Sequence, residues 1–506
     1  MSRNTPTPIY GVGGIDLHKF SKYNEYRMTK QDGQVIYVSY GRLKIYSDAK
    51  EITAHNVVDE VSRAYALHVR NRSDIKTLWE YYRGKTKILH KKKEIREEIN
   101  HKINENRAYE IVKFHKGYVF GEPIQYVRRE RASENTDDDT IATEINALNG
   151  YMSDANKSAC DNALAEWMYV AGTGYRMTLP NPRWTSDGDE APLRIFALDP
   201  MKTFVVYSTD IDEHPLMACV VVEREKNEKV FSVYTESAYF EFTDFAAVST
   251  KPNPLGMIPI IEYPAEQARL GVFEVVLPLL DALDELQSNR MDDIVQFVNS
   301  FLAILGGELD KETYDKLSEW KTLCLPEGAD AKYLSATLSQ SDVQTFKNDI
   351  YEAIYTICGS PNRNGGTSTS DTGSAVILRD GWQSAEARAK ATEEIFKSSE
   401  KEFLKIALRI LRDTVGTKLR LSDITPHFTR RNYDNIASKS QVLIAMLNNP
   451  KIHPEVAYAA CGMFPDPESA YLQGIAYYDE QMEKWEAQAV DENATEEDEE
   501  NVQATG

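Results

Sequence analysis

The stretch FEVVLPLLDALDELQSNRMDDIVQFVNSFLAIL, residues 273–305, is the part of the chain that indicates the fold most directly. Its apolar residues recur at three- and four-residue steps, which predicts one long helix, with Pro278 tolerated only near the first turn. The pair Gly306-Gly307 is expected to end it. Polar residues spaced i, i+3, i+4, i+7 and i+11 share one face of this helix: Asp281, Asp284, Glu285, Ser288 and Asp292. Most such acidic faces only meet water, so context must decide the role of this one.

Beyond this helix the sequence alternates between helices and flexible links. A compact insertion spans 308–340, a helix is predicted for 342–358, and a loop rich in Gly, Ser and Thr spans 362–373. A second long helix is predicted for 374–414, and short helical pieces joined by prolines follow over 423–488. The acidic end of the chain lacks apolar partners for a core and is expected to be disordered.

The part that precedes the long helix mixes helices with strands. Residues 1–46 are Gly-, Pro- and Tyr-rich, which predicts an extended arm with one hairpin around Asp32-Gly33. Helical spacing of apolar residues over 53–115, Ile95, Ile99 and Ile103 included, predicts amphipathic helices. Short runs of Val, Tyr, Phe and Thr over 191–245 predict a small antiparallel sheet. The fold class is therefore α+β and predominantly helical.

The composition limits the functions that the chain can have. A formal net charge of -21 over 506 residues argues against a tight non-specific grip on DNA or anionic lipid, because such binding needs clustered Lys and Arg. No apolar run approaches the roughly 18 residues of a membrane helix, and the N-terminus has no signal-peptide pattern. The five cysteines lie far apart among apolar or small neighbours, and we expect buried, reduced thiols.

No motif in the sequence predicts catalysis, a cofactor or a metal site. Gly84-Lys85-Thr86 matches the end of a phosphate-binding loop, but Trp79 stands where that motif requires its first glycine. The nine histidines form no metal-binding pattern, and Cys358 has no nearby histidine that would activate it. A basic run over 85–107 is interleaved with glutamates, which favours a solvated or subunit-pairing helix face over contact with a nucleic-acid backbone.

Several blocks of the sequence resemble the portal protein family of tailed phages, in particular the branch typical of siphophages that infect Gram-positive bacteria. These blocks occur in the family's order: YYRGK at 81–85, GYVFGEPI at 117–124, LDP at 198–200, LGMIPIIEYP at 255–264 and GSAVIL at 373–378. The resemblance covers most of the chain from about residue 78 to about residue 488. Ala265 departs from the asparagine that often follows Tyr-Pro in the family, and the first fifty or so residues match nothing in it.

The resemblance implies a portal fold of wing, stem, clip and crown that forms a cyclic ring. It divides the chain into an N-terminal arm (1–50), the wing (51–254), the wing exit with the first stem helix (255–300), the clip (301–340), the second stem helix (341–360), the tunnel loop (361–373), the long wing- and crown-linking helix (374–414), the crown (415–490) and an acidic disordered tail (491–506).

The resemblance also implies what the ring does. It would contain usually twelve subunits at one capsid vertex of the virion, assembled in the host cytoplasm, and double-stranded DNA would be packaged and later ejected through it. Expected partners are further copies of the chain, the DNA, the large terminase subunit, a head-to-tail adaptor, and the major capsid and scaffolding proteins, with no membrane. The ATPase would be the separate terminase, so no enzyme activity and no cofactor are expected. The alternative interpretation is another ring-forming virion connector that never touches DNA.

Three groups of residues are the sites that these inferences predict. The face formed by Asp281, Asp284, Glu285, Ser288 and Asp292 is expected to line the DNA channel, because like-charge repulsion leaves no deep wells along the path of the DNA. The tunnel loop would comprise Asn362, Arg363, Asn364, Gly365, Gly366, Thr367, Ser368, Thr369, Ser370, Asp371, Thr372 and Gly373. The clip would present Tyr314, Trp320 and Tyr333 to partner proteins, unless these aromatic residues form a local core.

Overall fold

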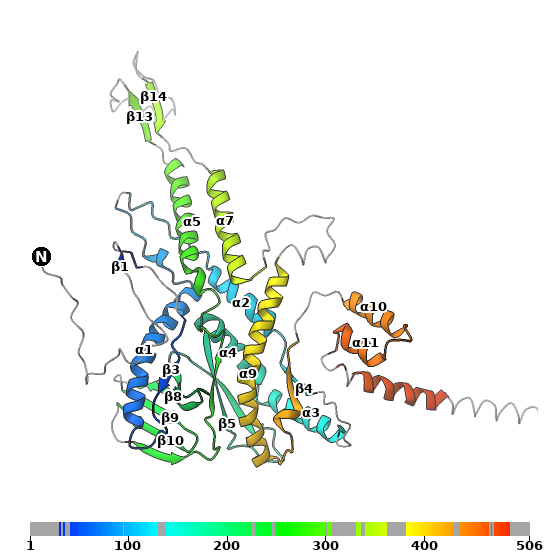
Figure 1. Cartoon of the computed structure of the whole chain (residues 1–506). Coiled ribbons are helices and arrows are strands. Elements are labelled where there is room, and N and C mark those ends of the chain that lie inside the picture. The colour runs from blue at the N-terminus through cyan, green and yellow to red at the C-terminus, as the bar shows by residue number, and fades with distance from the viewer. Residues whose placement is uncertain are drawn as a thin grey trace, which may run out of the picture. The chain divides into compact units, whose positions relative to one another are not determined.

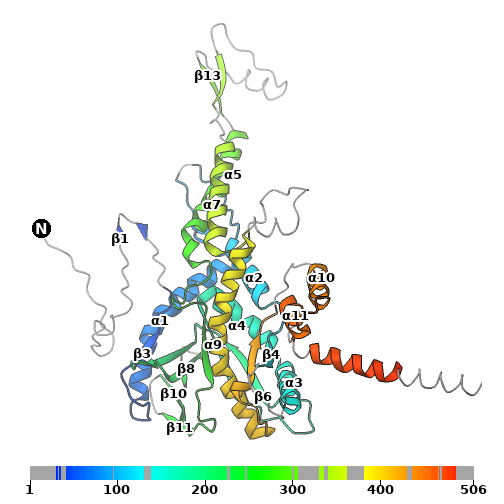
Figure 2. The same cartoon turned by 45° about the vertical axis from the view of Figure 1, so that its right-hand side comes forward.

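The computed structural model describes residues 30–31, 34–35, 41–94, 96–129, 138–224, 228–244, 248–298, 301–305, 330–334, 340–361, 381–429, 436–464, 467 and 470–485. These residues belong to two compact units, shown together in Figures 1 and 2. Unit 1 takes its residues from 1–116, 163–177 and 197–396, and unit 2 takes its residues from 117–162, 178–196 and 397–506.

A six-stranded sheet is the largest sheet of unit 1. Its strands follow the order β11-β10-β9-β8-β7-β3, and every pair is antiparallel except β3 with β7. The strands are β3 (Ile45–Ser47), β7 (Thr203–Ser208), β8 (Pro215–Glu223), β9 (Lys229–Tyr234), β10 (Ala238–Thr243) and β11 (Ser249–Pro252). The antiparallel sheet predicted for 191–245 is confirmed, and strands from outside that range extend it on both sides.

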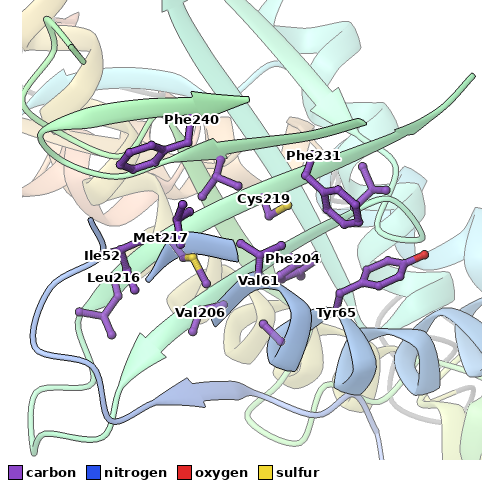
Figure 3. Packing of buried hydrophobic residues seen from close by; sticks show 14 of the residues in the cluster. Ile52, Val61, Tyr65, Phe204, Val206, Leu216, Met217, Cys219, Phe231 and Phe240 are labelled. Atoms are coloured by element: carbon purple, nitrogen blue, oxygen red, sulfur yellow. The ribbon is translucent and has the colours of Figure 1, made fainter. Parts of the chain in front are cut away.

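The hydrophobic core of unit 1 lies between this sheet and helix α1 (Val57–Tyr82). Val61 and Tyr65 on α1 pack against Phe204 and Phe231 of the sheet (Figure 3). The rings of Tyr65 and Phe231 meet edge to face with centroids 5.3 Å apart. Burial of such side chains stabilises the unit by about 2 kcal/mol each.

Two helices joined through a β-hairpin form the second part of unit 1. Helix α5 (Leu277–Val298) leads to β13 (Phe301–Leu305), which pairs antiparallel with β14 (Asp330–Leu334), and helix α7 (Gln340–Cys358) returns beside α5 (Figure 1). The helix predicted for 342–358 is confirmed. The helix predicted for 273–305 is wrong at its end, because the apolar run at 301–305 is a strand whose partner lies about thirty residues further on.

The segment between α1 and α2 (Arg107–Val119) departs from the helical prediction for 53–115. After the short turn of η2 (Lys87–His90), the described residues of 91–106 form no helix, although Ile99 and Ile103 have helical spacing. We call residues 83–106 the strap. Three of its backbone amides donate to side chains of α5.

The remaining elements complete both units. Strands β5 (Thr173–Pro180) and β12 (Ile260–Pro264) pair antiparallel, and strand β4 (Gln125–Arg128) pairs antiparallel with β15 (Ile424–His427) in unit 2. The other elements are β6 (Leu193–Leu198), η4 (Glu274–Val276), η5 (Leu421–Asp423), α3 (Asp138–Asp154), α4 (Lys157–Ala171), α9 (Trp382–Thr414), α10 (Ile436–Leu447) and α11 (Pro454–Cys461). Helix α9 confirms the prediction for 374–414 from residue 382 onward.

The hairpin near the N-terminus and the cysteines also agree with the sequence predictions. Strands β1 (Lys30–Gln31) and β2 (Gln34–Val35) pair antiparallel, which confirms the hairpin expected around Asp32-Gly33. The described cysteines are buried thiols, as expected: Cys160, Cys219, Cys358 and Cys461. Cys324 lies outside the described residues. None of the described helices combines the length and apolarity that crossing a bilayer requires.

Candidate functional site

The polar face of α5 binds the backbone of the strap. Three strap amides donate hydrogen bonds to it: His101 N to Asp292 Oδ1 (2.8 Å), Ile103 N to Ser288 Oγ (2.9 Å) and Glu105 N to Asp284 Oδ1 (3.0 Å). Two residues of extended chain advance by about 6.6 Å and four residues of helix by about 6 Å, so alternate strap residues meet every fourth residue of α5. We call this set of three hydrogen bonds the ladder. The ladder explains why Asp284, Ser288 and Asp292 recur at every fourth position of α5.

Asp292 is the most densely contacted carboxylate of the ladder. It is fully buried, and its oxygens accept from Lys93 Nζ at 2.7 Å, Lys91 Nζ at 2.9 Å and His101 Nδ1 at 2.8 Å. Burial alone would raise the pKa of Asp292, but the hydrogen bonds from Lys93, His101 and Lys91 hold that pKa well below its usual range. Asp292 therefore remains ionised wherever the strap is in place.

Asp284 and Asp281 fix the beginning of the strap. Asp284 accepts from Thr86 Oγ1 at 2.8 Å, and burial raises its pKa. Asp281 accepts from Tyr81 OH at 2.7 Å and from Lys87 Nζ at 2.6 Å. The strap is thus attached to α5 along nearly its whole length.

These contacts correct the expected channel lining. Asp284, Ser288 and Asp292 are only 4%, 0% and 0% exposed, because the strap of the same chain covers them. They cannot touch DNA while the strap is bound, so the expectation is wrong for these three residues. Asp281 is half-buried, and Glu285 alone of the five is exposed. The open face of α5 instead carries Glu285, Asn289 and Asp293.

The basic run over 85–107 is also corrected, because it is no helix face. Lys87, Lys91 and Lys93 turn inward to the carboxylates of α5. Arg83, Lys85 and Lys92 remain exposed. The strap therefore has an inner basic side bound to α5. Its exposed side is basic at first, with Arg83, Lys85 and Lys92, and acidic further on, with Glu94, Glu97 and Glu98.

Glu105 joins the strap to both helices, a role that sequence reasoning missed. It accepts from Lys347 Nζ (2.9 Å) and Tyr351 OH on α7, from Gln287 on α5, and from Arg107 Nη2 (3.0 Å). Burial opposes ionisation, but the hydrogen bonds from Tyr351 and Lys347 lower the pKa of Glu105. No local signal marks this residue, because its partners on α5 and α7 lie about 180 to 250 residues further along the chain.

His115 on α2 makes a second contact with α7. Its Nε2 lies 3.0 Å from the carbonyl oxygen of Cys358, the last residue of α7. Burial lowers the pKa of His115 to about 4. The neutral ring therefore donates Nε2–H to this carbonyl, and α2 and α7 are held together at their ends.

The other predicted sites lie largely outside the described residues. This holds for the tunnel loop, 362–373, and for Tyr314 and Trp320 of the clip. Tyr333 lies in β14, in register with Leu302 of β13.

Among the described residues, one group could present three ligand atoms to a metal ion. Asp210, Asp212 and His214 place these atoms within 4.8 Å of one another. All three are exposed, and the contact of His214 Nδ1 with Asp212 Oδ1 at 3.1 Å accounts for part of the grouping. Exposed acidic groups of this kind are common without an ion.

The paired helices α5 and α7 carry a β-hairpin at their far end, and the strap covers the polar face of α5. The family model described as "Phage portal protein, SPP1 Gp6-like" matches residues 63–495. The chain therefore belongs to this family, and it is a portal protein of a tailed-phage-like particle. The resemblance seen in the sequence is confirmed, and the family is one of structural proteins of the virion.

No curated protein matches the chain. Among solved structures, a chain described as "Neck of native GTA particle computed with C12 symmetry" aligns with 12% identity and a TM-score of 0.41, covering 78% of this chain and 94% of that one.

Proposed function

We propose that the chain assembles into a ring, of twelve subunits, through which double-stranded DNA enters the capsid and later leaves it. The family match over residues 63–495 carries this proposal. The proposal also accommodates the paired helices α5 and α7, since side-by-side copies of such a pair would surround a channel. The large terminase subunit, a head-to-tail adaptor, and the capsid and scaffolding proteins would then be the partners of the ring.

The parts of the chain take their roles from this proposal. Helices α5 and α7 would be the stem, and the hairpin β13–β14 with the residues that it encloses would be the clip, including Tyr314, Trp320 and Tyr333. The six-stranded sheet with α1 and α2 would belong to the wing. The residues after α9 would form the crown, and 362–373 would be the tunnel loop.

The open face of α5 is the part of the stem that we propose for the channel wall. Glu285 and Asp293 are exposed there, with Asn289 between them. A wall of carboxylates repels the phosphates of the DNA. The DNA would therefore slide along the wall without being held at the salt-dependent binding positions that several Lys or Arg contacts would create.

A packaging assay tests this role. Glu285→Lys combined with Asp293→Lys would present two cations per subunit to the phosphates, and we expect packaging to slow by at least about tenfold at low salt and to recover partly at high salt. Asp189→Lys makes the same kind of charge change at an exposed loop residue of unit 2 and should leave the rate unchanged. Normal packaging by the double variant at low salt would remove α5 from the channel wall.

A second assay tests the tunnel loop. Deletion of residues 365–369 removes Gly and Ser/Thr positions that allow several backbone conformations, and we expect rings that assemble but package poorly. Normal packaging by these rings would show that the loop is only a linker. A connector that never touches DNA would tolerate both this deletion and the α5 double variant, which separates it from a portal.

A further inference from the structure

The first part of the strap, residues 83–93, carries exposed basic side chains that have no ion-pair partners among the described residues. The sequence from Tyr81 to Lys93 contains no acidic residue. Arg83, Lys85 and Lys92 are exposed, and none of them has an ion-pair partner within the part of the chain that the structure describes. Leu89, in the same stretch of sequence, is 40% exposed. We call these four residues the basic surface.

Helix α7 has an acidic side that faces away from its buried contacts. Ile350, Ile354 and Cys358 are buried, whereas Asp342, Asp349 and Glu352 are exposed. At about 100° per residue, the three carboxylates lie on the opposite side of the helix from the buried residues. Phe346 is 55% exposed at the edge of this side. We call these four residues the acidic surface.

The charges of the acidic surface are not neutralised from within α7. Lys347 is the one basic residue of the helix, and its Nζ is bound to Glu105 of the strap. Among the described residues, none forms an ion pair with Asp342, Asp349 or Glu352. The surface therefore presents net negative charge next to one exposed aromatic ring.

The two surfaces lie on opposite sides of the helix pair. Around η2 the strap lies beside α5 on the side away from α7 (Figure 1), and only its end at Glu105 reaches α7. The acidic surface is on the side of α7 away from its packed face. Two different complementary surfaces on opposite sides of one subunit produce a head-to-tail interface, which gives a ring when the rotation between neighbours closes and a filament when it does not. A self-complementary dimer would instead require one surface that matches itself.

We propose that the basic surface of each subunit binds the acidic surface of the next copy of this chain in the ring. The inference rests on the ring proposed above and identifies the pairs that hold its stem together. Arg83, Lys85 and Lys92 of one copy pair with Asp342, Asp349 and Glu352 of its neighbour, and Leu89 and Phe346 contribute apolar contact. The open face of α5 is left free for the channel.

Charge reversal on either surface tests the interface. Lys85→Glu with Lys92→Glu, or Asp349→Lys with Glu352→Lys, places like charges opposite one another. We expect each double variant to raise the concentration for half-assembly of rings by at least about tenfold, measured by sedimentation of the full-length protein. These side chains are exposed, so the melting temperature of the dissociated subunit should stay within about 2 °C of wild type.

Mixing the two double variants gives the sharper result. Alone, each double variant assembles poorly, because like charges meet at its interface. In the mixture, the acidic strap of the first variant meets the basic α7 of the second. The unchanged basic strap of the second variant likewise meets the unchanged acidic α7 of the first. We expect rings of alternating subunits from the mixture, which native mass spectrometry identifies by their masses. The chain that carries all four substitutions should likewise assemble alone.

A matched control reverses two acidic residues on the neighbouring helix. Glu285→Lys with Asp293→Lys changes the charge as much as the α7 variant, and its rings should assemble like wild type. The interface would be overturned, while the ring itself stands, by either of two results. Both surface variants could assemble at the same concentration as wild type, or their mixture could form no rings. A wild-type chain that never forms rings would overturn the ring and the interface together.

Discussion

At the scale of single residues, Asp292 is a carboxylate of the polar face of α5 that is already bound by side chains of its own chain. Lys91, Lys93 and His101 surround it, so its charge serves the fold of its own chain. Helical spacing identified Asp292 as part of one polar face, and this was right. The sequence could not show that the face is covered, because the covering segment lies about 190 residues earlier.

Replacing Asp292 tests its role as an anchor. Asp292→Asn leaves two lysines beside a neutral amide, and we expect a loss of about 2 kcal/mol in unfolding free energy. The amides of His101 and Ile103 should exchange faster with solvent, since they belong to the ladder. Asp293→Asn is the control, because Asp293 is exposed and should change neither quantity. Unchanged exchange at His101 in D292N would contradict the ladder.

Two buried histidines predict how the stability of unit 1 depends on pH. Burial lowers the pKa of His68 and of His115 from 6.5 to about 4. Between these values the unfolded chain binds more protons than the folded chain, so stability is complete above pH 6.5 and falls toward pH 4. Each histidine contributes roughly 1.4 kcal/mol for each pH unit within this window.

Urea unfolding at pH 7.5 and at pH 5 measures this effect. The urea concentration at which half of the protein is unfolded should be lower at pH 5 than at pH 7.5. His115→Gln should reduce the difference between these two concentrations. A difference that is identical in wild type and H115Q would assign the pH dependence to other groups.

At the scale of elements, the strap shows where periodicity misleads. Ile95, Ile99 and Ile103 have helical spacing, yet the amides at 101, 103 and 105 donate to side chains of α5 instead of to carbonyls one turn earlier. A helix over these residues would forfeit all three bonds. Because tertiary contacts replace the local ones, no pattern within the strap itself could have revealed this.

The sequence also did not predict the strand pairings between segments that lie far apart in the chain. The apolar run of β13 reads equally well as helix or strand until β14 is known to pair with it. Strand β3 joins β7 in parallel across about 160 residues. By contrast, α7 and most of α9 follow directly from their own apolar stripes, because an amphipathic helix satisfies its backbone within itself.

Removing the charge of Glu105 should loosen the strap from α7. Glu105→Gln leaves Lys347 without its carboxylate, and we expect a loss of about 2 kcal/mol in unfolding free energy, with faster amide exchange in α7. The matched control is Glu98→Gln, because Glu98 is 67% exposed and meets Arg96 only at 3.4 Å. Its effect should stay below about 0.5 kcal/mol. Equal effects of the two changes would exclude Glu105 as the link.

At the scale of the whole molecule, each unit has its own buried polar centre. In unit 2, Lys157 is bound by Asp161 at 2.6 Å and by Glu400 at 2.9 Å, and Glu400 also accepts from Tyr126 OH at 2.6 Å. Unit 1 relies on the strap and the α1 core. The sequence predicted the portal family correctly. It did not reveal these centres, because their members are brought together only by folding.

A change within unit 2 should therefore act on that unit first. Glu400→Gln leaves the buried Lys157 with one carboxylate, and we expect unit 2 to lose about 3 kcal/mol. Amide exchange followed by mass spectrometry should show faster exchange in α3 and β4 and little change in α5. Uniform acceleration across both units would show that they unfold as one.

In the ladder, every two residues of the strap match four residues of α5. This spacing also restricts how many residues the strap can have between positions 93 and 101. Removal of a single residue between positions 93 and 101 would bring carbonyl oxygens, instead of N–H groups, opposite Asp292, Ser288 and Asp284. Removal of two would restore the alternation and shift every contact by one helical turn. Length variants of the strap should therefore be tolerated in pairs, as insertions in ordinary surface loops need not be.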